Sequence, residues 1–210
     1  MKKYFTKESL LKIFYSFIWV SVLVFTVDII TKWVIQNNLK FDGDSITLIP
    51  NFLFIKLSHN LGASFGMGSS GEIGWRIFWV VISIVLSGVL IYVFAKYFSK
   101  FNKTQKIALA LMIGGAIGNM VDRLFYWKAL VGFDGVIDWI DFQFGTWHFA
   151  TFNIADSCLV IGVIILILIE IINLVKEVRE KEKRGDYDLP PMELEQKQKE
   201  EHEDVQNRGK

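Results

Sequence analysis

Four long apolar stretches alternate with polar segments along the 210-residue chain. Each holds about 20 predominantly apolar residues, the length that an α-helix needs to cross a bilayer. The pattern predicts spans at about residues 13–35, 73–98, 107–125 and 154–175, of which the third is the least apolar and is rich in glycine. The expected fold class is therefore an all-α integral membrane protein, a bundle of four transmembrane helices.

The two longer connections between spans carry their own patterns. Residues 45–57 (SITLIPNFLFIKL) are rich in β-branched and aromatic residues, which favours a short strand or ribbon at the membrane surface. Residues 134–151 are rich in Asp, Trp and Phe, as is typical of a loop held at the level of the lipid headgroups. A small interfacial β element and a loop are thus expected on the outer side of the bundle.

Composition and charge agree with this division into a membrane domain and a tail. Hydrophobic residues make up 52% of the chain, and 20 of its 45 charged side chains fall in the last 35 residues. Residues 1–175 are expected to form the membrane-embedded domain, and residues 176–210 a charged cytoplasmic tail that begins helical and frays into disorder. The net charge of +1 argues against binding nucleic acid, and the single cysteine excludes an internal disulfide framework.

Lysine and arginine in short flanking segments predict the orientation in the membrane. They cluster before span one, between spans two and three, and after span four, at Lys2, Lys3, Lys7, Lys12, Lys96, Lys100, Lys103, Lys106, Lys176, Arg179, Lys181, Lys183 and Arg184. The two longer connections hold only Lys40, Lys56 and Lys128. Both termini are therefore expected in the cytoplasm, and the longer connections outside.

Ionisable residues inside membrane spans are costly, so they are candidates for function. They gather at one depth, near the outer ends of the spans. Span one carries Asp28 and Lys32 at i,i+4 spacing, and one stripe of span three carries Gly115, Asn119, Asp122 and Arg123. Span four begins with Asn153 and Asp156 one turn apart, and the preceding loop contributes Asp138 and Asp141.

Each group also has a purely structural interpretation. Asp28 and Lys32 could be an ion pair at a helix end, Asp122 could pair with Arg123, and Asp156 could be an acid favoured by the dipole of a helix N-terminus. Three spans and a loop that converge on one depth favour a shared site over several unrelated structural pairs.

Other chemistries find little support in the sequence. His59 and His148 lie in the outer segments without the HExxH spacing of a zinc protease, and no serine-nucleophile or phosphate-binding motif occurs. Cys158 is expected to be a small buried apolar residue within span four. No metal and no cofactor are expected, which leaves aspartate as the candidate chemistry.

Five motifs in order resemble the lipoprotein signal peptidase family, also called signal peptidase II. They are D-x-x-T-K at 28–32, N-x-G-x-S-F at 60–65, G-x-x-G-N-x-x-D-R at 115–123, V-I-D-W at 136–139 and F-N-x-A-D at 152–156. The resemblance covers about residues 10–175. It implies a bacterial inner-membrane aspartyl endopeptidase that removes the signal peptide from prolipoproteins, cutting before the diacylglyceryl-modified cysteine. Lipidated prolipoproteins and membrane lipids would be its partners, and we expect a monomer.

The resemblance also implies roles for individual residues. The catalytic pair would be Asp138 and Asp156, and the residues that shape the site and hold substrate would be Asp28, Asn60, Gly115, Asn119, Asp122, Arg123 and Asn153. The segment between Arg123 and Asp138 is longer than the family's usual spacing, so Asp134 and Asp141 are alternatives to Asp138. Asp138 is preferred because V-I-D-W followed by I-D-F matches the family's paired pattern.

Two other function classes remain for comparison. A small channel or proton-coupled transporter could use the same membrane aspartates, but a proton relay should spread ionisable groups through the membrane depth. Here the inner halves of the spans carry few of them, with Glu170 the exception. A purely structural membrane scaffold would not explain the clustered Asp and Asn residues.

Overall fold

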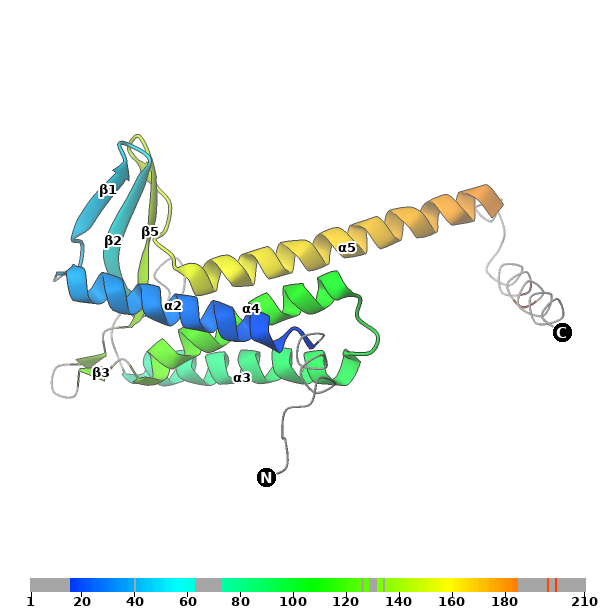
Figure 1. Ribbon diagram of the computed structural model, residues 1–210, viewed down its shortest axis with the longest axis horizontal. Helices are drawn as coiled ribbons and strands as arrows, with labels where there is room; N and C mark the ends of the chain where they lie inside the picture. The colour runs from blue at the N-terminus through cyan, green and yellow to red at the C-terminus, as the bar shows by residue number, and fades with distance from the viewer. Residues whose placement is uncertain are drawn as a thin grey trace, which may run out of the picture. The chain divides into compact units, whose positions relative to one another are not determined.

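The computed structural model describes residues 16–39, 41–62, 73–125, 127–128, 132–133, 135–184, 196 and 199. The helices are α2 (Ile18–Asn38), α3 (Ile73–Tyr97), α4 (Lys103–Phe125) and α5 (Ile154–Arg184). The strands are β1 (Ser45–Ile49), β2 (Leu53–Asn60), β3 (Trp127–Lys128), β4 (Gly132–Phe133), β5 (Val136–Phe144) and β6 (Trp147–His148) (Figure 1). The chain divides into two compact units, residues 1–166 and 167–210, and α5 runs through the boundary.

The four predicted spans are confirmed as helices. Among the described residues, four helices are long and apolar enough to cross a membrane: Ile18–Asn38, Gly74–Tyr97, Lys103–Phe125 and Ile154–Lys183. Residues 13–15 of the first predicted span lie outside the described residues. The second unit is described through residue 184, where α5 is exposed on nearly all sides, and then only at residues 196 and 199. The predicted disorder of the tail therefore stays a prediction.

Two helices are longer than their apolar stretches predict. The third begins at Lys103 because Asn102 and Gln105 cap it reciprocally. The Gln105 N–H donates to Asn102 Oδ1 at 2.9 Å, and the Asn102 N–H donates to Gln105 Oε1 at 3.0 Å. Such a box satisfies two backbone donors that a helix start leaves free, so it marks the beginning of a helix independently of hydropathy. The fourth continues to Arg184 through polar residues that are good helix formers.

A four-stranded antiparallel sheet stands beside the helix ends, in the strand order β1-β2-β5-β6 (Figure 1). Its central pairing joins the two long connections, with Ser58 opposite Asp138 and Asn60 opposite Val136. The predicted ribbon at residues 45–57 is confirmed as β1 and β2. The predicted loop at residues 134–151 is wrong for 136–144, which form β5, so the fold is a helical membrane bundle that carries a sheet and is not all-α. Strand pairing across such a sequence distance has no local signature, which is why composition alone suggested a loop.

Two apolar clusters hold the first unit together. Leu90 and Phe94 of α3 pack with Leu109, Ile113 and Ala116 of α4, and Leu159 of α5 lies against them. Ile35 and Leu39 at the end of α2 pack with Leu57 of β2 and Ile137 of β5. The second cluster fixes the sheet on the end of α2, beside the ends of α4 and α5.

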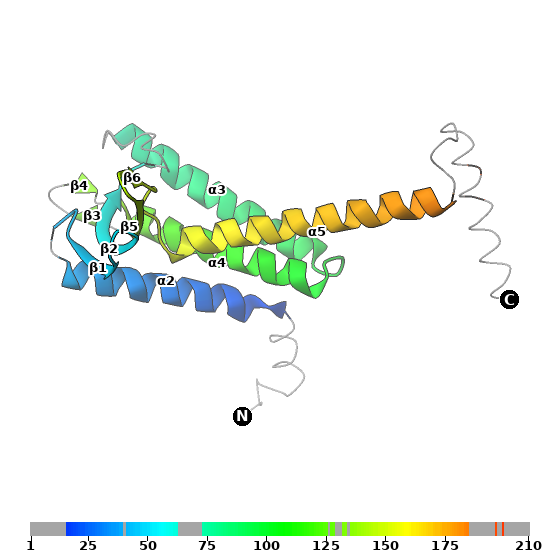
Figure 2. The same cartoon turned by 90° about the horizontal axis from the view of Figure 1, so that it is seen from above.

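Helix α4 lies between α2 and α3 (Figure 2). Its glycines make close contacts with α2 and α5. A β-carbon at Gly114 would lie 2.7 Å from the Ser21 carbonyl oxygen and 2.8 Å from Val24 Cβ, both on α2. A β-carbon at Gly115 would collide with the Ala155 carbonyl oxygen of α5. Glycine at these positions lets the helix backbones approach closely, as small residues do in membrane helix pairs.

The α2–α4 contact gives a stability prediction. Gly114→Ala should lower the free energy of unfolding by about 1–3 kcal/mol, because the added methyl group overpacks against the backbone of α2. Thermal unfolding of the purified protein in detergent measures the loss. Gly88→Ala on α3 is the matched control, since nothing lies within 4 Å of a β-carbon there. Equal stability of the two variants would contradict the close contact.

Candidate active site

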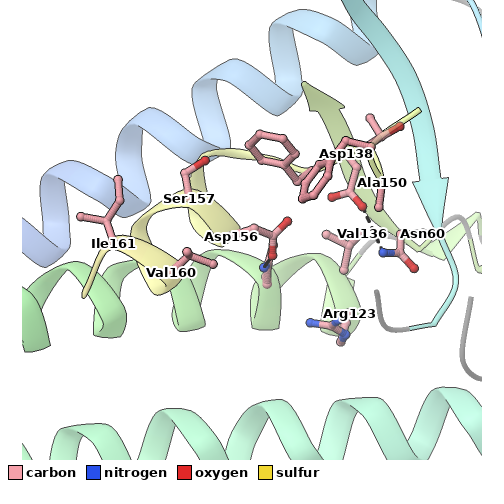
Figure 3. Close-up of a pocket in the computed structure, with 13 residues that line it drawn as sticks. Asn60, Arg123, Val136, Asp138, Ala150, Asp156, Ser157, Val160 and Ile161 are labelled. Carbon is pink, nitrogen blue, oxygen red and sulfur yellow. Dashed lines mark hydrogen bonds between the residues drawn. The ribbon is translucent and has the colours of Figure 1, made fainter. Parts of the chain in front are cut away.

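The structure brings the nine predicted site residues together at the sheet end of the helices. They come from α2, β2, α4, β5, the residue before α5, and the first turn of α5. Five of them line one cavity of about 570 Å³, namely Asn60, Asn119, Arg123, Asp138 and Asp156 (Figure 3). The other four, Asp28, Gly115, Asp122 and Asn153, are buried behind it.

The remaining wall of the cavity is mostly apolar. It consists of Val136 of β5, residues 149–152 of the segment before α5, and Ser157, Val160 and Ile161 of α5. A smaller cavity of about 190 Å³ lies along α3, α4 and α5 and shares Asn119, Arg123 and Asp156 with the first. Asp156 therefore borders two openings, one beside the sheet and one beside α3.

Asp138 lies in β5, not on the interfacial loop that the sequence suggested. Asp138 is 3% exposed, and its carboxylate accepts a hydrogen bond at each oxygen. Asn60 Nδ2 donates to Oδ2 at 3.0 Å and Asn153 Nδ2 donates to Oδ1 at 2.7 Å. Burial, and secondly the nearby Asp156 carboxylate, raise the pKa of Asp138 to about 7. Strand pairing and two amides thus hold a carboxyl group that keeps its proton near neutral pH.

Asp156 sits in the first turn of α5 and forms a capping box with Asn153. The Asp156 N–H donates to Asn153 Oδ1 at 2.9 Å, and the Asn153 N–H donates to Asp156 Oδ2 at 3.2 Å. Its other oxygen, Oδ1, accepts from Asn119 Nδ2 at 2.7 Å, and Asp156 is part of the cavity wall. The structural interpretation of Asp156 as an N-terminal acid is correct, and the same carboxylate also faces the cavity.

Two asparagines link the aspartates. Asn119 Nδ2 donates to Asp156, whereas Asn153 Nδ2 donates to Asp138. Asn153 Nδ2 also donates to Asn119 Oδ1 at 3.1 Å, so the two amides contact each other behind the cavity wall. The chain of amides fixes both carboxylates against a common support.

A buried ion triad lies directly behind these amides. Lys32 Nζ lies 2.7 Å from Asp28 Oδ2 and 2.7 Å from Asp122 Oδ2, and all three side chains are fully buried. The ion pair between Asp28 and Lys32 that the sequence allowed is confirmed, and both side chains are fully buried in the protein. Pairing of Asp122 with Arg123 is wrong, because Asp122 faces Lys32. Sequence analysis left Lys32 out of the site, although the D-x-x-T-K motif contains it.

The triad also bonds to backbone groups of the site. Asp28 Oδ1 accepts the Ala155 N–H at 3.0 Å, and Asp122 Oδ2 accepts the Ile137 N–H at 3.4 Å. Ala155 precedes Asp156 and Ile137 precedes Asp138. The triad therefore sets the backbone next to each of the two aspartates.

Arg123 reaches the cavity from the last turn of α4 (Figure 3). Its Nη2 donates to the Gly62 carbonyl oxygen at 3.5 Å, and its side chain borders both cavities. A guanidinium there offers several N–H donors to a bound main chain.

The alternative candidates lie elsewhere or outside the described residues. Asp141 is 1% exposed, accepts from Gln143 Nε2 at 2.6 Å, and is not part of the cavity wall. Asp134 is outside the described residues. His59 lies 3.3 Å from Asp42 in the sheet region, and His148 is exposed on β6. Within the described part of the chain, no group of three or more His, Cys, Asp or Glu side chains could hold a metal ion.

Comparison with known proteins shows the family to which the chain belongs. A family model described as signal peptidase (SPase) II matches residues 20–172. A lipoprotein signal peptidase of Salmonella newport is 40% identical over 153 residues, which is 72% of this chain and 85% of that protein. One of Coxiella burnetii is 37% identical over 163 residues, covering 78% and 93%.

Two solved structures of bacterial membrane enzymes are also similar. The first, determined at 2.3 Å by the in meso method, has a TM-score of 0.61 and 36% identity over 79% of this chain and 90% of its own. The second, determined at 1.9 Å, has a TM-score of 0.59 and 35% identity over 72% and 90%. With the family model spanning most of the chain, and relatives this similar over nearly their full length, the chain belongs to the signal peptidase II family.

Proposed function

We propose that this chain is an aspartyl endopeptidase of the bacterial inner membrane that removes signal peptides from diacylglyceryl-modified prolipoproteins. It would act as a monomer and cut on the amino side of the lipidated cysteine. The observation that carries the aspartyl mechanism is that Asp138 and Asp156, from different elements, border one cavity and are each held by an asparagine amide. The relatives named lipoprotein signal peptidase support the substrate class.

Two neighbouring carboxyl groups can hydrolyse a peptide without metal, because like charges at close range leave one of them protonated. The raised pKa of Asp138 makes it the acid of the pair. Asp156 takes a proton from water as the water oxygen attacks the scissile carbonyl carbon, and Asp138 gives its proton to the carbonyl oxygen. When the tetrahedral intermediate collapses, the C–N bond breaks and the proton on Asp156 passes to the leaving amine. One hydroxyl of the intermediate returns its proton to Asp138 as the carbonyl of the product acid forms. The pair titrates as a unit.

The walls of the site suit a lipidated peptide. Apolar residues of α5 and of the segment before it would contact the acyl chains, while Asn60 and Arg123 would donate to main-chain carbonyl oxygens. Satisfying those carbonyls matters at membrane depth, where water is scarce. The second opening, beside α3, gives the apolar signal peptide a separate approach to Asp156.

The side of the membrane follows from the charge pattern of the loops. We infer cytoplasmic termini and a site near the outer face, because the lysine-poor connections form the sheet and contribute Asn60, Asp138 and Asn153 to the site. A channel or proton-coupled transporter is disfavoured by the same arrangement. The buried acids of the described residues gather at one end of the helices, whereas Glu170 is exposed on α5.

Asp138→Asn and Asp156→Asn should each lower cleavage of a lipidated prolipoprotein peptide by at least about 10³-fold, because the mechanism needs both carboxyl groups together. The double variant should be no worse than either single one. The assay uses purified protein in detergent, and EDTA should leave the wild-type rate unchanged. Asp141→Asn is the matched control and should stay active. Loss of activity in Asp141→Asn with activity kept in Asp138→Asn would reverse the assignment.

The pH profile should report the acid of the pair. Because the pKa of Asp138 is about 7, kcat/KM should fall as pH rises above about 7 and the acid loses its proton.

The raised pKa of Asp138 also makes folding stability depend on pH. The folded protein binds this proton more tightly than the unfolded chain, in which the pKa of the carboxyl group has its usual value of 3.8. The free energy that this tighter proton binding adds to folding is therefore fully present below about pH 4 and is lost as pH rises through 7. Wild-type Tm should drop over this window relative to Asp138→Asn, and parallel Tm curves would refute a raised pKa.

Arg123→Lys tests substrate binding by the guanidinium. Lysine keeps the charge but loses the planar fork, so kcat/KM should fall about 10- to 100-fold, the range expected for loss of a charged hydrogen bond. Thermal stability in detergent should change little. If activity and Tm fall together, Arg123 acts in helix packing and does not bind substrate.

A further inference from the structure

Lys32 is a fully buried cation whose bonding is complete. An ammonium has three N–H donors. The Nζ atom of Lys32 has three oxygens within 3.0 Å, namely Asp28 Oδ2 and Asp122 Oδ2 at 2.7 Å and Asn119 Oδ1 at 3.0 Å. Lys32 itself borders neither described cavity at the site and cannot touch substrate there.

Charge neutralisation alone does not explain this arrangement. One carboxylate would balance the ammonium, and Asp28 and Asp122 already supply two. The third bond goes to the neutral amide of Asn119. A buried lysine that served only to join α2 to α4 would not need to contact an asparagine that itself contacts Asp156.

The bond to Lys32 determines which way the Asn119 amide points. An ammonium cannot accept a hydrogen bond, so Asn119 must turn its carbonyl oxygen to Lys32 and its NH₂ group to the opposite side. There Nδ2 donates to Asp156 Oδ1 at 2.7 Å. The same carbonyl oxygen accepts from Asn153 Nδ2, which in turn donates to Asp138 Oδ1. One cation thereby aims a donor at each of the two aspartates.

We propose that Lys32 is a positioning residue for the aspartate pair, acting through the amide of Asn119. This inference rests on the proposed function, in which Asp138 and Asp156 carry the reaction. Without Lys32 the Asn119 amide is free to flip and present its oxygen to Asp156. A carboxylate facing an amide oxygen loses a hydrogen bond to its charged form, so the pair would hold its protons more tightly and work only at higher pH.

The test is Lys32→Gln, which removes the charge but keeps a polar side chain. We expect kcat per folded molecule to fall about 10- to 100-fold. This is the typical effect, about 10- to 100-fold, of removing a residue that orients a group in direct contact with the reacting residues. KM should change less than threefold, and the acidic limb of the pH–kcat profile should move to higher pH. A purely structural role would lower the folded fraction and leave the profile of the folded molecules in place, which would overturn the proposal.

The route through Asn119 is tested by a double-mutant cycle. In an Asn119→Ala background, Lys32→Gln should cause no further loss in kcat, because the amide through which it acts is gone. Effects that multiply would overturn the proposal. Ser21→Ala is the matched control, since the Ser21 hydroxyl also joins α2 to α4, and its acceptor at 2.8 Å, the Ala110 carbonyl oxygen, is not part of a predicted site residue. It should keep wild-type kcat and pH profile.

A second variant covers the case in which Lys32→Gln does not fold. The triple change Lys32→Met, Asp28→Asn and Asp122→Asn removes all three charges at once, so no unpaired ion stays buried. A folded triple variant with a depressed kcat that Asn119→Ala does not lower further would support positioning through Asn119. Wild-type kcat in the triple variant, or a further loss on adding Asn119→Ala, would overturn the proposal. Failure of the aspartyl mechanism is recognised separately, because Asp138→Asn and Asp156→Asn would then stay active whatever Lys32 does.

Discussion

The ammonium of Lys32, enclosed by Asp28, Asp122 and Asn119, is the interaction on which the rest of the site depends. A charge taken out of water is tolerated only when its partners satisfy it completely, and removing one partner of such a group is far more costly than breaking an exposed pair. Here the partners belong to α2 and α4. Asp28 accepts the Ala155 N–H at its other oxygen, Oδ1, and Asp122 accepts the Ile137 N–H at Oδ2, the same oxygen that faces Lys32. Four elements are thus tied to one cation, and the two backbone N–H groups bonded there directly precede Asp156 and Asp138.

Around this centre, residues that cap α5 or pair the strands β2 and β5 also hold the two carboxylates, Asp138 and Asp156. Asn153 caps α5 with Asp156 and at the same time donates to Asp138. Strand pairing opposite Ser58 fixes the backbone of Asp138, and Asn60, at the end of the same strand β2, donates to its carboxylate. Because each carboxylate is held by bonds that also build the fold, little reorganisation is left for the reaction itself, which is how preorganised polar groups stabilise a transition state.

The sequence predicted the features that depend on local pattern. It failed for features that depend on contacts between residues far apart in the chain. The spans follow from length and hydropathy, and the cost of polar groups at membrane depth pointed to the clustered Asp and Asn residues. Asn60, and the choice of Asp138 and Asp156 as the catalytic pair, came from the resemblance to the family. The strand character of residues 136–144 depends on pairing with β2, far away in sequence, and composition suggested a loop instead. The structural alternative for Asp122, pairing with Arg123, rested on the two being adjacent. Successive residues of a helix point in different directions, and the partner of Asp122 came from another helix. Lys32 was left out because nothing in the sequence shows that it contacts Asn119.

The glycines of α4 and the buried charges are parts of one constraint. A β-carbon at Gly118 would lie 2.5 Å from Asp28 Oδ2, and one at Gly115 would collide with the Ala155 carbonyl oxygen. Small residues are usual where membrane helices pack closely, but here the space they leave is filled by the carboxylate of α2 and by the backbone that carries Asp156. Any larger residue at either position would push Asp28 or the start of α5 away from α4, and the bond between Asp28 Oδ1 and the Ala155 N–H would be lost. Close helix packing is therefore needed at this depth chiefly because the polar network cannot form without it.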